Sequence, residues 1–341
     1  MNRPYDPKTQ KSRGISAKFL FFTYSFLFFF DFFKNPLDKA AEIVYNTTIL
    51  TLYQTKAKKK GKKTMKRFLT LTLAILMVFT MVAGFSACKK EEKSDYADIK
   101  EKGYFVCGIT VYAPMNYFDE TDSLVGFDTE FAEAVAKELG LEVKFQIINW
   151  PNKYLELNGG SIDAIWNGFT YGTEKDGVAR TEYVDFTHAY LENRQCIVTK
   201  TDKLATLNTK DSFKGLNGAA EGGSSGEGVA IELAGDENKI AKFTAQTAAL
   251  MEVVSGNADF AVIDYQMAKA MVGQGDYATL AINNAYEPES EVYAIGCRKG
   301  SDFTAEINKA IEKLSEDGTL AALAEKYGLT NDLIPNIGKA E

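Results

Sequence analysis

Two short stretches of the sequence place polar groups where they could hold opposite charges. Residues 222–226 (Gly-Gly-Ser-Ser-Gly) precede a helix-like stretch, residues 229–233, so their amides and hydroxyls could bind an anion, as helix N-termini commonly do. No Gly-Lys-Ser/Thr follows, which argues against a phosphate loop, and a plain flexible loop is the alternative. Asp264 directly follows the apolar run 260–263, where its carboxylate could bind a cation or cap the next helix.

The elements that must position these groups alternate between strands and helices from residue 103 onward, which predicts an α/β fold with mostly parallel strands. Asp128 is expected to cap a helix that ends at Gly140, and Thr319 is expected to cap the last helix. One more helix is indicated by an apolar stripe of Phe303, Ile307, Ile311 and Leu314. The expected strands are residues 104–111, 143–148, 162–166 and 260–263.

A short pattern occurs twice in the chain. Residues 160–166 and 256–262 both read glycine, two residues, aspartate and then a strand-like run. Two similar lobes are therefore expected, each an open sheet with its ligand edge at the carboxyl ends of the strands. The chain at residues 166–170 and 263–264 would then face one shared crevice.

Seven segments in order resemble the polar amino acid family of ABC-transporter solute-binding proteins, also known as bacterial extracellular solute-binding protein family 3. They are residues 112–115 (YAPM), 125–128 (VGFD), 160–163 (GSID), 167–170 (NGFT), 180–190, 223–225 (GSS) and 259–264. The resemblance covers residues 96–330, and its specificity lies in the ordered set. It implies a type II periplasmic-binding-protein fold with two lobes, each an open, mostly parallel sheet flanked by helices. Two crossover strands would join lobe 1 (residues 96–191 and 293–341) to lobe 2 (residues 192–292).

The resemblance also implies a site for one free amino acid between the lobes. The ligand carboxylate would be bound by Arg180, Ser224, Ser225 and Thr170, and the ammonium by Asp264 and Gly168, with Thr170 also in reach of the ammonium. The ligand side chain would contact Tyr112, Trp150, Asn167 and Glu221, although core packing is the alternative for Tyr112 and Trp150. Only arginine supplies a rigid bidentate fork for a carboxylate. Arg180 is preferred to Lys175 because its spacing to Tyr190 fits the family without a gap.

The identity of the ligand is left open between two classes. Glu221 would repel an acidic ligand, which favours a neutral polar or a cationic amino acid. Ile109 argues against a strictly basic ligand, since family members selective for basic amino acids tend to carry a carboxylate at its place. No cofactor or metal is expected, because Cys107, Cys196 and Cys297 lie in apolar runs without metal-type spacing and are interpreted as buried hydrophobes.

A targeting segment is predicted at residues 65–87. Residues 66–67 are basic, residues 68–82 are apolar, and small residues precede Cys88, as in a lipoprotein signal peptide. Cys88 would be lipidated, although Phe85 departs from the usual leucine, and residues 88–95 would form a tether. This predicts an extracytoplasmic protein, lipid-anchored to the outer face of the cell membrane.

Residues 1–64 do not fit this arrangement, because a signal peptide has to begin the chain. We expect Met65 to be the true start and residues 1–64 to be a misannotated upstream extension; the alternative is an extra membrane segment at residues 19–33. Of the 39 Lys and Arg and 46 Asp and Glu, 15 basic and only 4 acidic residues lie in residues 1–87. The remainder carries a net charge of about −18, which disfavours nucleic acid as a partner.

The predicted function is therefore that of the binding subunit of an amino acid ABC importer. Its partners would be a membrane permease and the free amino acid, and the protein would be a monomer. One rival is an enzyme of the same fold, such as a dehydratase, but the sole histidine, His188, has no nucleophile beside it by motif. A second rival is the sensor domain of a receptor, which would need an output module that the sequence does not indicate.

Overall fold

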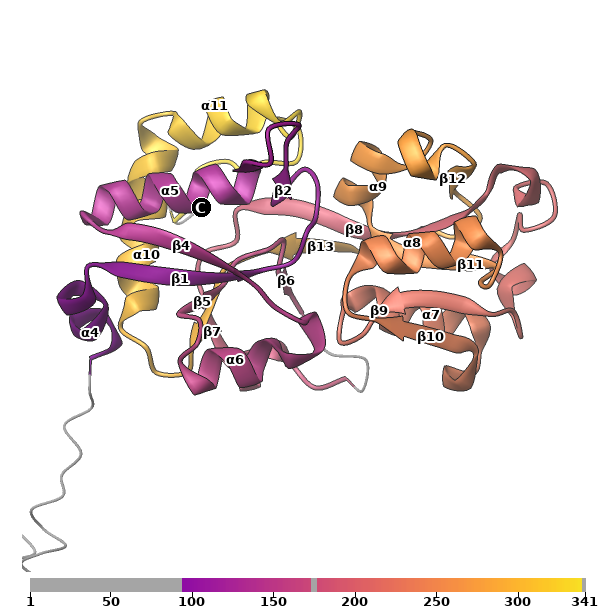
Figure 1. Ribbon diagram of the computed structural model, residues 1–341, viewed down its shortest axis with the longest axis horizontal. Helices are drawn as coiled ribbons and strands as arrows, with labels where there is room; N and C mark the ends of the chain where they lie inside the picture. The colour runs from indigo at the N-terminus through magenta and orange to yellow at the C-terminus, as the bar shows by residue number, and fades with distance from the viewer. Residues whose placement is uncertain (1–93, 173–176, 339–341) are drawn as a thin grey trace, which may run out of the picture. The chain divides into compact units, whose positions relative to one another are not determined.

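The computed structural model in Figure 1 describes residues 94–172 and 177–338. Residues 1–93, with the predicted signal peptide and Cys88, lie outside the described residues, as does Lys175. Among the described residues, no helix combines the length and the apolar character that a membrane span requires. The described chain forms two lobes of sheets flanked by helices, which confirms the predicted α/β architecture. The sheets are mixed and not mostly parallel, because β8 (Leu191–Lys200), β13 (Ser290–Tyr293) and β14 (Gly296–Arg298) pair in antiparallel orientation with their neighbours.

Lobe 1 is built on a five-stranded sheet in the order β4-β1-β5-β14-β7. Its strands are β1 (Tyr104–Ile109), β4 (Glu142–Ile147), β5 (Ala164–Ile165), β7 (Val184–Phe186) and β14 (Gly296–Arg298). β1 pairs in parallel with both β4 and β5, while β14 runs antiparallel to its two neighbours. The late strand β14 thus lies in the same sheet as the first strand of the fold.

Helices cover both faces of this sheet (Figure 1). Phe105, Cys107 and Ile109 of β1 pack on one face with α5 (Phe127–Leu139) and α10 (Phe303–Glu316), whereas Val106 packs on the other with α6 (Lys153–Gly159). The stripe predicted on α10 is buried, as expected. The helices of lobe 1 are α4 (Asp95–Lys102), α5 (Phe127–Leu139), α6 (Lys153–Gly159), α10 (Phe303–Glu316) and α11 (Thr319–Lys326), and the hairpin β2 (Tyr117–Phe118) and β3 (Leu124–Val125) precedes α5.

Lobe 2 repeats the strand order of lobe 1. β10, β9 and β11 are parallel neighbours, as β4, β1 and β5 are. In both lobes the aspartate of the repeated pattern accepts a hydrogen bond from a backbone amide. Asp163 Oδ2 accepts from the Val106 amide and Asp259 Oδ2 from the Asn217 amide, each with an N···O distance of 3.0 Å. The elements are β9 (Gly218–Glu221), β10 (Ile240–Phe243), β11 (Phe260–Asp264), β12 (Leu280–Asn283), α7 (Ser225–Ala234), α8 (Gln246–Ser255) and α9 (Tyr265–Met271).

Two antiparallel strands join the lobes. β8 (Leu191–Lys200) pairs at its start with β13 (Ser290–Tyr293) and further along with β11 and β12. β13 also pairs with β6 (Thr170–Tyr171). Short 3-10 helices complete the chain at Trp150–Asn152, Arg180–Glu182, Thr201–Lys203, Lys210–Phe213, Glu237–Lys239 and Gly275–Tyr277.

Some local predictions are wrong. α5 begins at Phe127, with Gly126 as its N-cap and no side-chain cap, so Asp128 does not cap it. Thr319 is the first residue of α11 and not its cap, which is Gly318. Ser94 caps α4, which begins at Asp95, so the predicted tether ends earlier than residue 95.

Cys107, Cys196 and Cys297 are free and buried, as predicted.

Candidate functional site

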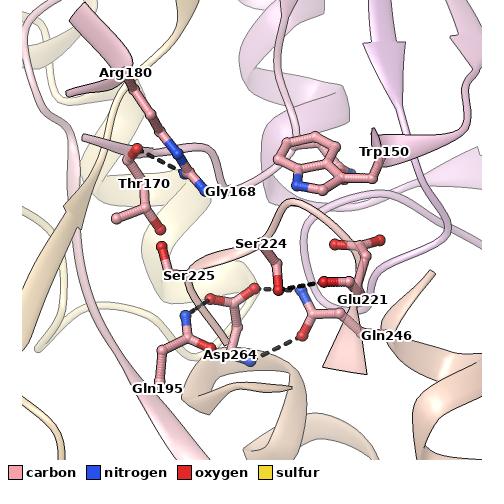
Figure 2. Close-up of a pocket in the computed structure, with 11 residues that line it drawn as sticks. Trp150, Gly168, Thr170, Arg180, Gln195, Glu221, Ser224, Ser225, Gln246 and Asp264 are labelled. Atoms are coloured by element: carbon pink, nitrogen blue, oxygen red, sulfur yellow. Dashed lines mark hydrogen bonds between the residues drawn. The ribbon is translucent and has the colours of Figure 1, made fainter. Parts of the chain in front are cut away.

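One pocket brings together residues from widely separated parts of the chain (Figure 2). Its empty volume, including the mouth, is about 240 Å³. Every predicted contact residue except Tyr112 lines it. The lining residues are Trp150, Asn167, Gly168, Thr170, Arg180, Gln195, Glu221, Ser224, Ser225, Gln246 and Asp264.

The Arg180 guanidinium lies in the pocket wall with only 1% of the residue exposed. Nη1 donates to the carbonyl oxygen of Thr170 at 2.9 Å, and Nη2 donates to that of Gly223 at 3.3 Å. The group also lies over the ring of Phe169, 4.9 Å from its centroid. These contacts fix the plane of the guanidinium, which is the property that bidentate binding of a carboxylate requires.

The glycine-serine stretch forms the N-terminus of α7, which begins at Ser225, four residues earlier than the predicted helix-like stretch. The Ser224 hydroxyl caps the helix by accepting from the Glu227 amide at 3.1 Å, and it donates to the Glu221 carbonyl at 2.7 Å. The Ser225 hydroxyl is buried and has no hydrogen-bond partner among the described residues. Ser225 and the positive end of the helix are therefore the groups best placed to receive an anion.

Asp264 ends β11 and is the N-cap residue of α9, but its side chain makes no capping bond. Its Oδ1 accepts from Asn193 Nδ2 and Gln195 Nε2, both at 2.7 Å, and its Oδ2 accepts from Gln246 Nε2. Burial raises the pKa of Asp264 to about 7, and the neighbouring charge of Glu291 adds to that shift. A cation beside Asp264 would therefore favour its ionised form.

Gly168 lies in the loop between β5 and β6, across the pocket from these groups. Its φ is +55°, and a Cβ atom there would lie 2.7 Å from Cε1 of Tyr112, so glycine is required. Its amide donates at 2.7 Å to Oδ2 of the fully buried Asp128, whose Oδ1 accepts from the Tyr190 hydroxyl at 2.8 Å. The buried carboxylate that was predicted to cap α5 instead anchors this loop.

Trp150 and Glu221 form another part of the pocket (Figure 2). Trp150 Nε1 and Glu221 Oε1 are buried, and neither has a hydrogen-bond partner within the described part of the chain. Burial raises the pKa of Glu221 well above its usual value, and the charge of Asp264 adds to this. Unpartnered buried polar atoms are uncommon in native proteins, so a bound ligand is expected to supply partners here.

Two predicted side-chain contacts take other roles. Tyr112 does not line the pocket, because its ring packs in the core and its hydroxyl lies 2.5 Å from that of Tyr293. This matches the core-packing alternative. Asn167 lines the pocket, but its Nδ2 donates to Thr110 O at 2.9 Å and to Asn116 Oδ1 at 2.7 Å. Its amide shapes the wall.

Sequence reasoning missed Gln195 and Gln246, which both line the pocket and donate to Asp264. Gln195 carries a weak signal in the sequence, because it is a polar residue directly before the apolar run 196–198 of β8. Gln246 begins α8, and nothing in its local sequence indicates that it faces the end of β11.

Two further features bear on catalysis and metal binding, namely the position of His188 and the grouping of possible metal ligands. His188 lies outside the pocket lining, with Nε2 3.0 Å from Glu312 Oε1 of α10. Within residues 94–172 and 177–338, no group of three or more His, Cys, Asp and Glu side chains could hold a metal ion.

Comparison with known proteins shows the family to which the chain belongs. The model of bacterial extracellular solute-binding proteins, family 3, matches residues 105–330. The chain belongs to this family. The match includes every residue that lines the pocket and both strands that join the lobes.

Relatives in this family differ in what they bind. The L-cystine-binding protein TcyA of Bacillus subtilis is 28% identical over 274 residues, covering 75% of this chain and 96% of TcyA. The solved structure of an ancestral arginine-binding protein bound to arginine is 33% identical, with a TM-score of 0.60, covering 66% of this chain and 98% of the other. An ancestral amino acid-binding protein, a precursor of cyclohexadienyl dehydratase, is 27% identical, with a TM-score of 0.60 and coverage of 69% and 99%. This chain thus shares its type II fold with both solved structures.

Proposed function

We propose that this protein is the extracytoplasmic binding subunit of an amino acid ABC importer, which captures one free amino acid as its two lobes close. The observation that carries the proposal is that Arg180 of lobe 1 and Asp264 of lobe 2 line the same pocket. A free amino acid has a carboxylate and an ammonium on one carbon, so a site for it needs a cationic fork and an anionic acceptor close together.

Each charge of the ligand has a defined place in this proposal. Arg180 and the N-terminus of α7 at Ser225 bind the carboxylate, with Ser224 and Thr170 holding these two groups in position. Asp264 binds the ammonium together with the carbonyl of Gly168. Neither charge is well solvated in the closed pocket, so each needs its partner to offset the cost of leaving water.

The ligand side chain is placed beside Trp150 and Glu221. The unpartnered Glu221 Oε1 would accept a hydrogen bond from an amide or a cationic group, and the indole face favours either. The ligand is accordingly a neutral polar or cationic amino acid. The cystine-binding and arginine-binding relatives support this range.

Closure of the lobes is supported by two contacts that cross the pocket. Lys153 Nζ of α6 donates to the carbonyl of Gly223 at 2.9 Å, and Arg180 Nη2 donates to the same oxygen at 3.3 Å. Ligand contacts made only in the closed state would shift the equilibrium toward it. The closed protein would then deliver the ligand to a permease, as a monomer held at the membrane by lipid on Cys88.

The anchor and the start of the chain can be tested together. Mass spectrometry of the native protein should find a diacylated N-terminal Cys88 and no peptide from residues 1–64. A peptide from residues 1–64, or an unmodified Cys88, would overturn this part of the proposal.

A thermal-shift screen of the purified protein against the free amino acids and L-cystine tests the binding function. A ligand that binds only the folded state raises the melting temperature, by an amount that grows with its concentration. No shift with any amino acid would overturn the proposal. An enzyme of the same fold is the second candidate, and chemical conversion of the bound amino acid during incubation would favour it.

A further inference from the structure

A ring of two carboxylates and two amides lies at the junction of the lobes, next to the pocket. Asn193 Nδ2 donates to Asp264 Oδ1 at 2.7 Å and to Glu291 Oε1 at 2.6 Å. Gln195 Nε2 donates to the same two oxygens at 2.7 and 2.8 Å. A side-chain amide has two N–H groups, so both amides are fully used in bridging the carboxylates.

The strand register explains why these four residues meet. Asn193 and Gln195 are two residues apart in β8, so their side chains point to the same face. Glu291 of β13 is the cross-strand partner of Asn193, and Asp264 of β11 is the partner of Gln195. The ring therefore spans the two strands that join the lobes and the end of the strand that carries the ammonium acceptor.

Glu291 also reaches lobe 1. Its Oε1 accepts from the Thr170 hydroxyl at 2.9 Å, and the carbonyl of Thr170 accepts from Arg180 Nη1. A continuous chain of hydrogen bonds thus links the proposed carboxylate clamp to the proposed ammonium acceptor. Glu291 is the charged residue in the middle of that chain, and it is not among the residues that line the pocket.

We propose that Glu291 is a positioning residue for the ammonium site. It holds Asp264 and Thr170 in their binding arrangement through shared donors, and its negative charge increases the attraction of the site for the ligand cation. This inference rests on the proposed function. A second carboxylate held this close raises the cost of ionising Asp264 until a positive charge arrives, so ligand binding and loss of a proton should be coupled.

The ionisable groups around Asp264 decide how such coupling would be observed. They are Glu291 and Tyr293 of β13, Cys196 of β8, Glu221 of β9, Tyr112 after β1, and Arg180 across the pocket, while the side chain facing it from α8 is the uncharged Gln246. Burial raises the pKa of Cys196, Tyr112 and Tyr293, so they stay neutral between pH 5 and 8.5. Asp264, whose pKa is about 7, is a carboxyl whose titration falls within this range.

The test is calorimetric titration at several pH values between 5 and 8.5. The ligand is whichever of L-arginine, L-glutamine and L-cystine binds the unmodified protein most tightly. With Asp264 at a pKa of about 7, affinity should fall by about 100-fold from pH 8 to pH 5, because a protonated carboxyl cannot pair with an ammonium. Glu291→Gln removes the charge with little change in shape, so its affinity should fall by less than about tenfold over the same range.

Two variants complete the comparison. Glu289→Gln removes a charge from an exposed position of the same segment and should behave as the unmodified protein. Glu291→Asp keeps the charge on a side chain that is one methylene shorter. The dependence of its affinity on pH should therefore lie closer to that of the unmodified protein than the dependence of Glu291→Gln does. A purely structural role for Glu291 predicts instead that affinity drops by the same factor at every pH.

A Glu291→Gln profile that is parallel to the unmodified one would overturn the inference and leave the proposed function intact. Absence of any amino acid binding by the unmodified protein would overturn both. If Glu291→Gln does not fold, the number of protons released per ligand at pH 6, measured in buffers of different ionisation enthalpy, is compared between the unmodified protein and Glu291→Asp. Lower release by Glu291→Asp supports the coupling through Glu291, and equal release contradicts it.

Discussion

Arg180 is the residue on which recognition of the ligand carboxylate depends in this account. Its guanidinium is buried and oriented by the carbonyls of Thr170 and Gly223. Arg180→Ala should weaken binding by about 2–5 kcal/mol, because the ligand carboxylate would be buried without its charge partner. Arg180→Lys keeps the charge but loses the fork, and about 1–3 kcal/mol should be lost. Calorimetry measures both, and unchanged affinity in Arg180→Ala would rule out the assigned role.

Glu221 is expected to set the preference between cationic and neutral ligands. Its Oε1 is buried at the pocket and has no partner among the described residues. Glu221→Gln should lower the ratio of the affinities for L-arginine and L-glutamine by about tenfold or more, because one charge contact is lost for arginine alone. Glu289→Gln is the control for net charge. A ratio that does not change would show that the ligand side chain lies elsewhere.

At the scale of single residues, the sequence predicts a pocket residue where the residue's position within a strand or motif already determines its neighbours. Asp264 follows an apolar strand, so its place at the carboxyl end of a sheet could be predicted. Arg180 was preferred through the family resemblance, and it lines the pocket. Gln246 could not be found, because its contact with Asp264 depends on how α8 packs against β11. The family resemblance predicts Tyr112 as a ligand contact, with core packing as the alternative, but its ring packs in the core and its hydroxyl lies 2.5 Å from that of Tyr293.

The loop between β5 and β6 carries Gly168 and leads into Thr170, the first residue of β6, and Asp128 of α5 anchors this loop through the Gly168 amide. Asp128→Ala leaves the Gly168 amide without its acceptor, so ligand affinity should fall by about tenfold and stability by about 1–3 kcal/mol. Asp128→Asn is the matched control, since its oxygen can accept from Gly168 while its amide donates to Tyr190. Calorimetry and thermal melts compare the two. Equal loss in both variants would contradict a hydrogen-bonding role.

Helices and strands could be predicted where a short sequence pattern determines them. The repeated Gly-x-x-Asp pattern marked equivalent strands in both lobes, and the two aspartates accept equivalent backbone amides. Helix starts were less predictable. Aspartate is a common helix N-cap residue, but the Asp128 carboxylate instead accepts hydrogen bonds from the Gly168 amide and the Tyr190 hydroxyl, which are distant in the sequence. Tertiary hydrogen bonds of this kind leave no local pattern.

For the whole molecule, the buried carboxyls predict an unusual dependence of stability on pH. Burial raises the pKa of Asp128 to about 6 and that of Asp264 to about 7. A raised pKa means that the folded state holds protons that the unfolded state has lost, so this stability is fully present below the ordinary carboxyl pKa of about 4 and is lost progressively as pH rises from there through the folded values of about 6 and about 7. The ligand-free protein should gain on the order of 2–4 kcal/mol between pH 8 and pH 5.

Thermal melts at pH 5 and pH 8 measure this effect. The matched variant is Asp264→Asn, which should flatten the profile because it removes the group with the higher pKa. The ligand-induced rise in melting temperature should show the opposite trend and be larger at pH 8, where Asp264 is more readily ionised. A ligand-free protein that is less stable at pH 5 than at pH 8 would contradict the assigned environments of these carboxyls.

The central claim is that two lobes bring one cation and one anion to the opposite charges of a single amino acid. A crystal structure of the complex with the tightest-binding amino acid tests it most directly. The account predicts the ligand carboxylate within hydrogen-bonding distance of the Arg180 guanidinium and the ammonium within that distance of the Asp264 carboxylate. A ligand bound with these groups exchanged, or bound outside the pocket that both residues line, would contradict it.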